Sequence, residues 1–141
     1  MRTGLAALVL VAAASALLAG ACGNPSTAPP RTIDVAGDRV TVASLVDAEA
    51  GLCAARASAA TDPVAARATF YNRAHTPLHS GARALEDVDR AQAATLLEAM
   101  QKVESGLDSP TPSLPDDLAH LADVYRAGLG RLAISAPPCE K

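Results

Sequence analysis

Apolar residues recur at helical spacing along most of this 141-residue chain from Ser44 onwards, and this periodicity restricts the fold more than any other feature. Successive residues of an α-helix are turned by about 100°, so positions i, i+3, i+4 and i+7 share one side. Segments with this pattern begin near Ser44, after Asp62, near Glu86 and after Ser113. About four amphipathic helices with short connections predict an all-α fold, a small antiparallel helical bundle over 44–141.

Capping residues and prolines mark the first two helices. The first helix is expected over 44–60. Asp62 followed by Pro63 supplies an N-cap and a proline at the first position of the second helix. Pro77 is expected to kink this helix near 74–76, because proline removes one backbone hydrogen bond.

The last two helices are separated by a proline-rich loop. The third helix is expected to begin near Glu86 or Asp87 and to end at about Leu107. Ser113 is expected to cap the fourth helix, which ends before Pro137.

Residues 1–21 have the anatomy of a secretion signal. Arg2 supplies a positive charge, 5–18 is an apolar run interrupted only by Ser15, and the small residues 19–21 precede Cys22. These three parts in this order are typical of a signal peptide that is removed on export.

The stretch from Leu18 to Cys22 (LAGAC) resembles the lipobox of bacterial lipoproteins, although Ala19 stands where that family usually has leucine. The resemblance covers residues 1–22. It implies that Cys22 becomes the mature N-terminus, carries acyl chains such as palmitate, and anchors the chain at the extracytoplasmic face of the cell membrane. Two alternatives stay open: cleavage at the same bond by an ordinary signal peptidase, releasing a soluble protein, or an uncleaved membrane anchor.

Residues 22–43 are expected to connect the lipidated cysteine to the bundle. The part 23–31 is rich in proline, serine and threonine, which is typical of a flexible tether. The part 32–42 alternates apolar and polar residues around Gly37 and Asp38, and we expect a short hairpin there.

The number of cysteines is consistent with export. The chain has three, and acylation of Cys22 leaves Cys53 and Cys139 as an even pair. Disulfides persist in oxidising compartments, so a Cys53–Cys139 disulfide bond is predicted to tie the first helix to the C-terminus. The alternative is two unpaired buried thiols.

Composition limits the size of the domain and the class of partner. Cleavage before Cys22 leaves 141 − 21 = 120 residues, enough for one domain. Without Arg2, 11 basic residues face 15 acidic ones, so no nucleic-acid partner is expected.

His75 and His79 are the strongest candidates for chemistry. Side chains four residues apart on a helix have Cβ atoms about 5–6 Å apart, which offers two imidazoles to one metal ion. Glu49, on the core-facing side of the first helix, is the expected third ligand, and Met100 is a weaker one. His120 is expected to face water. The candidate cofactors are copper, zinc and haem iron.

The same residues also have an interpretation without metal. His75 would then be a boundary histidine with one hydrogen bond, His79 would be solvated, and Glu49 would pair with an arginine such as Arg56. Glu49, Arg56 and Gln92 are expected on inward faces, where they would satisfy one another or line a polar site next to His75.

Motifs of common enzyme classes are missing from the sequence. It has no G-x-S-x-G elbow, no glycine-rich phosphate loop and no C-x-x-C pair. The leading expectation is a non-enzymatic, membrane-anchored helical module that binds a protein partner or small ligand. The alternative is a metal-binding accessory lipoprotein that uses His75 and His79.

Overall fold

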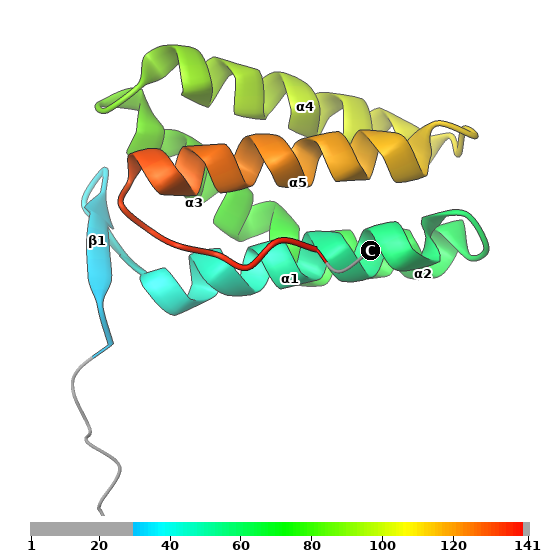
Figure 1. Ribbon diagram of the computed structural model, residues 1–141, viewed down its shortest axis with the longest axis horizontal. Coiled ribbons are helices and arrows are strands. Elements are labelled where there is room, and N and C mark those ends of the chain that lie inside the picture. The colour runs from blue at the N-terminus through cyan, green and yellow to red at the C-terminus, as the bar shows by residue number, and fades with distance from the viewer. Residues whose placement is uncertain (1–29, 140–141) are drawn as a thin grey trace, which may run out of the picture.

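The computed structural model describes residues 30–139, in which helices form a small bundle with a two-stranded hairpin at one end (Figure 1). The predicted small helical bundle is therefore confirmed. The signal peptide 1–21, Cys22 and the tether up to residue 29 lie outside the described residues. Within 30–139, no helix combines the length and the hydropathy that crossing a bilayer requires.

The hairpin expected around Gly37 is present. Strands β1 (Thr32–Val35) and β2 (Asp38–Thr41) pair antiparallel, and the turn between them has positive φ at Ala36 and Gly37. A two-stranded hairpin alone is marginally stable in water. Here Val35 is buried and the hairpin packs against the helices, so the structured body extends upstream of residue 44.

Helix α1 (Val42–Ala59) begins two residues before the expected start at Ser44. The Thr41 hydroxyl accepts a hydrogen bond from the backbone N–H of Ser44 at 3.2 Å, and the Ser44 hydroxyl donates to the Thr41 carbonyl at 2.8 Å. Thr41 is therefore the N-cap, because its side chain satisfies a donor that the helix leaves free.

The expected second helix is one continuous rod made of three parts: α2 (Pro63–Thr69), a π-helical turn η1 (Phe70–Ala74) and α3 (His75–Glu86). Asp62 caps it by accepting a hydrogen bond from the Ala65 N–H at 2.9 Å, with proline at the first helical position as predicted.

The irregularity expected from Pro77 takes the form of the π-helical turn. The His75 N–H donates to the carbonyl of Phe70, five residues back. Pro77 has no N–H to donate to the carbonyl of Arg73, and the widened turn immediately precedes it.

Helix α4 (Arg90–Asp108) starts later than the expected Glu86 because α3 continues through that residue. Asp89 caps α4 by accepting the Gln92 N–H at 3.1 Å. Helix α5 (Leu114–Arg131) follows the proline-rich loop, with acidic residues in its first turn as its dipole favours.

The side chain of Ser113 does not cap α5. Its hydroxyl donates to the Asp117 carboxylate at 3.0 Å instead of accepting a backbone N–H. The backbone of Ser113 is already helical, so the residue does not have the extended geometry that a capping side chain needs.

Residues 132–139, called here the C-terminal strap, run from the end of α5 back along α1 (Figure 1). Cys139 at the end of the strap is bonded to Cys53 on α1, with Cα atoms 5.2 Å apart. The predicted disulfide bond is thus present. Tyr125 on α5 also joins α1, because its hydroxyl donates a hydrogen bond to the carbonyl of Leu45 at 2.9 Å.

Candidate metal centre

The two histidines singled out by their spacing point toward one another from the first turns of α3. Their Nε2 atoms are 3.3 Å apart, and their rings are nearly perpendicular with centroids 4.7 Å apart. The four-residue spacing thus brings two nitrogen ligands to one point, as expected for His75 and His79.

A carboxylate from the neighbouring helix completes the group. Glu104 on α4 places Oε1 3.2 Å from Nε2 of His75. One ligand atom from each of His75, His79 and Glu104 lies within 4.8 Å of the other two. These three residues are called the histidine site below.

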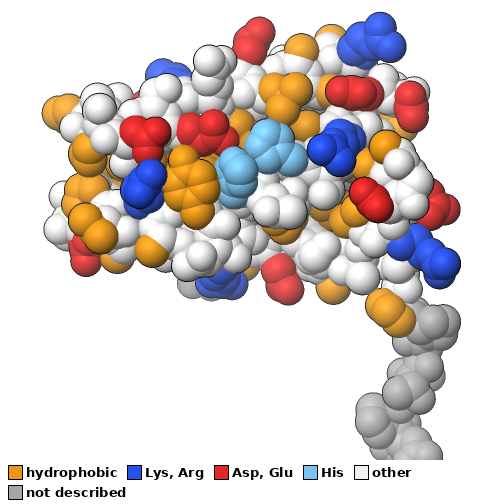
Figure 2. Space-filling view, turned by 180° about the vertical axis from the view of Figure 1, so that it is seen from behind, with side chains coloured by type: hydrophobic (Ala, Val, Ile, Leu, Met, Phe, Trp, Pro, Cys, Tyr) orange, Lys and Arg blue, Asp and Glu red, His pale blue; other side chains and the backbone are white. Residues whose placement is uncertain are grey.

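The histidine site lies on the outer face of the bundle and not in its core. The side chains of His75 and Glu104 are each 31% exposed. Figure 2 shows histidine side chains side by side on this face, with an acidic side chain next to them. An ion can therefore reach the site directly from solvent.

Hydrogen bonds alone do not satisfy all three of these ligand atoms. Nε2 of His75 has either one N–H or one lone pair. Both Nε2 of His79 and the carboxylate of Glu104 approach that single position. One proton would have to be shared between two acceptors, whereas a cation accepts all three lone pairs at once.

Two of the three spacings at the histidine site match those around a small tetrahedral cation, and the third lies within 4.8 Å. Zinc binds imidazole nitrogen and carboxylate oxygen at about 2.0–2.2 Å, so two ligand atoms on one tetrahedron are about 3.3 Å apart. The two shortest ligand–ligand distances at the histidine site are 3.3 Å and 3.2 Å.

Aromatic rings fix the position of His75. The ring of Phe70 meets it edge-on at 5.9 Å, and that of Tyr71 is tilted against it at 5.1 Å. The π-helical turn produces the contact with Phe70. Such a turn places residue i+5 above residue i, and so brings Phe70 beside His75. The aromatic contacts restrict the rotation of the imidazole before any ligand binds.

The second imidazole is biased toward its neutral form. Burial lowers the pKa of His79, and the neighbouring His75 and Arg83 lower it further against the opposing effect of Glu104. A neutral imidazole is the form that binds metal ions.

The structure does not bring Glu49, the expected third ligand, to the histidines. Glu49 lies on α1 and is 1% exposed, and its Oε1 accepts a hydrogen bond from Nη1 of Arg126 at 3.1 Å. Glu104 has the place expected for Glu49. Its sequence signal is its position between Val103 and Leu107 at the border of the apolar stripe of α4, where a polar residue flanks the packed face.

The other residues singled out in the sequence do not belong to the histidine site. Met100 is buried in the core, and His120 is exposed as expected. Arg56 was expected to face inward but is exposed. Gln92 donates to the carbonyl of Val124 at 2.9 Å, which satisfies its amide group across the bundle.

A second group of potential ligands lies where α1 meets the strap. One oxygen of Glu49 and the sulfur atoms of Cys53 and Cys139 lie within 4.8 Å of one another. These three residues are called the cysteine site below. Its sulfur atoms are bonded to each other, so they do not act as thiolate ligands.

The carboxyl group of Glu49 is incompletely paired. Its Oε2 is buried and has no hydrogen-bond partner among the described residues. Burial raises its pKa from 4.5 to about 7, although the charge of Arg126 opposes the shift.

The comparisons with protein-family models, curated proteins and solved structures return no match to this chain. The function is therefore inferred from the geometry of its own residues.

Proposed function

We propose that this chain is a lipid-anchored, extracytoplasmic protein that binds a transition-metal ion, Zn²⁺ or Cu²⁺, at the histidine site. The observation that carries the proposal is the convergence of two imidazole nitrogens and one carboxylate oxygen within 4.8 Å of one another, with both contacts of His75 Nε2 near the spacing that such an ion imposes. The metal is then the ligand of the binding module expected from the sequence.

The donor set favours zinc and copper over other cations. Calcium and magnesium prefer oxygen ligands, whereas imidazole suits zinc and copper. Haem is disfavoured, because its axial ligands lie on opposite faces of the porphyrin, while Nε2 of His75 and Nε2 of His79 are 3.3 Å apart.

The number of ligands favours exchangeable binding. Structural zinc sites are closed by four protein ligands, whereas the histidine site has three and is reached from solvent. The fold also has a hydrophobic core of its own, so it does not depend on the ion. We infer a role in holding a metal ion at the membrane surface and releasing it to a partner.

The metal proposal is tested by titrating the purified mature chain with Zn²⁺ and Cu²⁺ in competition with a chromophoric chelator. We expect one ion per chain with a Kd below micromolar. His75→Ala should weaken binding at least about 100-fold, since two remaining ligands are too few for a stable site.

The matched controls are His120→Ala and Glu49→Gln. Both should leave the Kd unchanged, because neither residue belongs to the histidine site. Glu104→Gln should weaken binding at least about 10-fold, since a neutral amide oxygen replaces a charged carboxylate ligand. Absence of binding, or equal effects of Glu49→Gln and Glu104→Gln, would contradict the proposal.

The lipid anchor is tested separately by mass spectrometry of the membrane-extracted protein. The N-terminal peptide should begin at Cys22 and carry the mass of a diacylglyceryl group. An unmodified Cys22, or a peptide that retains residues 1–21, would refute anchoring and leave the metal proposal standing.

A further inference from the structure

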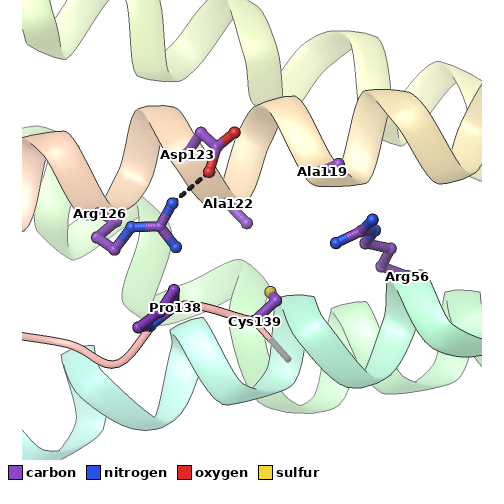
Figure 3. A pocket seen from close by; sticks show the side chains of 7 residues that line it. All are labelled: Arg56, Ala119, Ala122, Asp123, Arg126, Pro138 and Cys139. Atoms are coloured by element: carbon purple, nitrogen blue, oxygen red, sulfur yellow. Dashed lines mark hydrogen bonds and ion pairs between the residues drawn. The ribbon is translucent and has the colours of Figure 1, made fainter. Parts of the chain in front are cut away.

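The disulfide bond between Cys53 and Cys139 lies beside a buried carboxyl group and can be reached from the surface. Pro138 and Cys139 line a cavity of about 290 Å³ between the strap, α1 and α5. Figure 3 shows Arg126 and Asp123 on α5 pointing toward one side of this cavity, with Arg56 of α1 on another. Access from the cavity distinguishes Cys139 from a cysteine sealed in the core.

We propose that this disulfide exchanges with a dithiol protein of the same compartment, and that Glu49 donates a proton to the leaving sulfur. The proposal rests on the cysteine site and does not depend on the metal site. It adds a redox activity to a chain proposed above only to bind.

The position of Glu49 carries the argument. One of its oxygens lies within 4.8 Å of both sulfur atoms, in a side chain that is 1% exposed. Oε1 is used by Arg126, while Oε2 is buried without a partner. An ionised carboxylate would need donors on both oxygens, whereas a neutral carboxyl group has a proton to give.

The charged and polar groups around Glu49 come from α5 and from the wall of the cavity. Arg126 on α5 pairs with both Glu49 and Asp123, and the phenol of Tyr125 is committed to a backbone carbonyl. Arg56 from α1 lines the same cavity. Burial, the dominant effect at Glu49, raises its pKa to about 7, so both protonation states are populated near neutral pH.

The exchange balances in two steps. A thiolate of the partner attacks Sγ of Cys139, forms a mixed disulfide and breaks the bond to Cys53, whose sulfur takes the proton of Glu49. The second partner thiolate attacks the partner's sulfur in the mixed disulfide and releases Cys139 as a thiolate. Solvent then protonates both Cys139 and the carboxylate of Glu49. The protein disulfide gains two electrons and the partner dithiol becomes a disulfide.

Proton donation matters because the leaving sulfur is half-buried. A thiolate formed away from water is destabilised by desolvation, and a proton delivered as the bond breaks removes that cost. After reduction, Ile134 still holds the start of the strap through its N–H bond to Leu129 at 2.9 Å. Only the part of the strap beyond Ile134 is freed, and its release opens the cavity.

The test measures how fast excess dithiothreitol reduces the disulfide of the oxidised, folded chain between pH 5.5 and 8.5. Each rate is divided by the concentration of dithiothreitol thiolate at that pH. In the wild type this normalised rate should fall about tenfold as pH rises through 7, since a positioned acid contributes at least that much. Glu49→Gln should abolish the step and leave the low rate at every pH.

The matched control is Asp123→Asn, which removes a carboxyl group from the same cavity but not from the cysteine site. It should retain the step, with a midpoint moved to lower pH, because the charge of Asp123 raises the pKa of Glu49. A flat wild-type profile would overturn the proposal without the need for any variant. So would rates that follow only the free energy of unfolding, which is the behaviour of a purely structural disulfide.

Discussion

The histidine site and the cysteine site each gather three potential ligands within 4.8 Å, but they differ in which of these atoms are already bonded and which are buried. In the cysteine site two of the three atoms are joined covalently and the carboxyl group is buried. In the histidine site the three atoms are not bonded to one another and lie on the outer face of the bundle. The comparison teaches that proximity alone does not make a metal centre, because ligand atoms that are already bonded or sealed from solvent are not available to an ion.

The largest expected effect separates the two sites by stability. Replacing Cys53 and Cys139 by alanine opens a loop with a sequence separation of 86 residues, which should lower the free energy of unfolding by about 4–5 kcal/mol in the chain-entropy model. Urea unfolding monitored by circular dichroism measures the loss. Zinc affinity should change less than about twofold below the unfolding transition, because α3 and α4 hold the ligands. A large loss of affinity would mean that the two sites are coupled.

The next effect concerns the buried carboxyl group of the cysteine site. The pKa of Glu49 is about 7 in the folded chain and near 4.5 in the unfolded one, so the folded state holds an extra proton between those values. The stabilisation is complete below about pH 4.5 and is lost as pH rises to 7, amounting to about 3 kcal/mol. Glu49→Gln should remove this slope in urea unfolding series at pH 5 and 7.5.

The control for that measurement is Glu98→Gln, which neutralises an exposed carboxylate of α4. It should keep the wild-type slope between the two pH values. If Glu49→Gln and Glu98→Gln gave the same slope as the wild type, burial of the carboxyl group would have no energetic consequence.

A smaller effect concerns the histidine site. Zinc at 100 times its Kd should raise the free energy of unfolding by about 2.7 kcal/mol, because the ion binds only the folded chain. The double variant His75→Ala with His79→Ala should show no increment, while His120→Ala should show all of it. Without metal, the double variant should unfold within about 1 kcal/mol of the wild type, as expected for partly exposed side chains. A greater loss would show that the histidines serve the fold.

The smallest effect belongs to the surface ion pair next to the histidine site. Arg67 and Asp108 are 2.9 Å apart with side chains 53% and 60% exposed. A double-mutant cycle with alanine should give a coupling of about 0–0.5 kcal/mol, since water and salt screen exposed pairs. A coupling above about 1 kcal/mol would mean that this face is more rigid and less solvated than the exposure implies.

Local signals accounted for most of the fold. The helical periodicity predicted the bundle, and Asp62 with Pro63 predicted where the second rod begins. The boundary errors arose where two signals competed. The third helix was expected to begin near Glu86 or Asp87, but Asp89 caps α4 because its side chain reaches the Gln92 N–H. Ser113 precedes α5 with helical backbone angles, which sequence reasoning cannot foresee.

The two histidines of the histidine site could be predicted from the sequence, but the carboxylate could not. His75 and His79 lie on one helix, so their separation follows from helical geometry alone. The third ligand depends on which helix packs against α3 and in what rotation, and this placed Glu104, rather than Glu49, beside them. The same packing aimed Glu49 at Arg126 and the disulfide.

The amino-acid sequence by itself determined the helices and the histidine pair, because both depend on residues close together in the chain. It also determined the pairing of two cysteines, because that prediction depends only on the number of cysteines. Tertiary structure decided which carboxylate joined the imidazoles and which was left buried beside the sulfur atoms. The physical reason is that α3, α4 and α5 meet through long-range packing, and small rotations of a helix about its axis exchange the residues that face its neighbours.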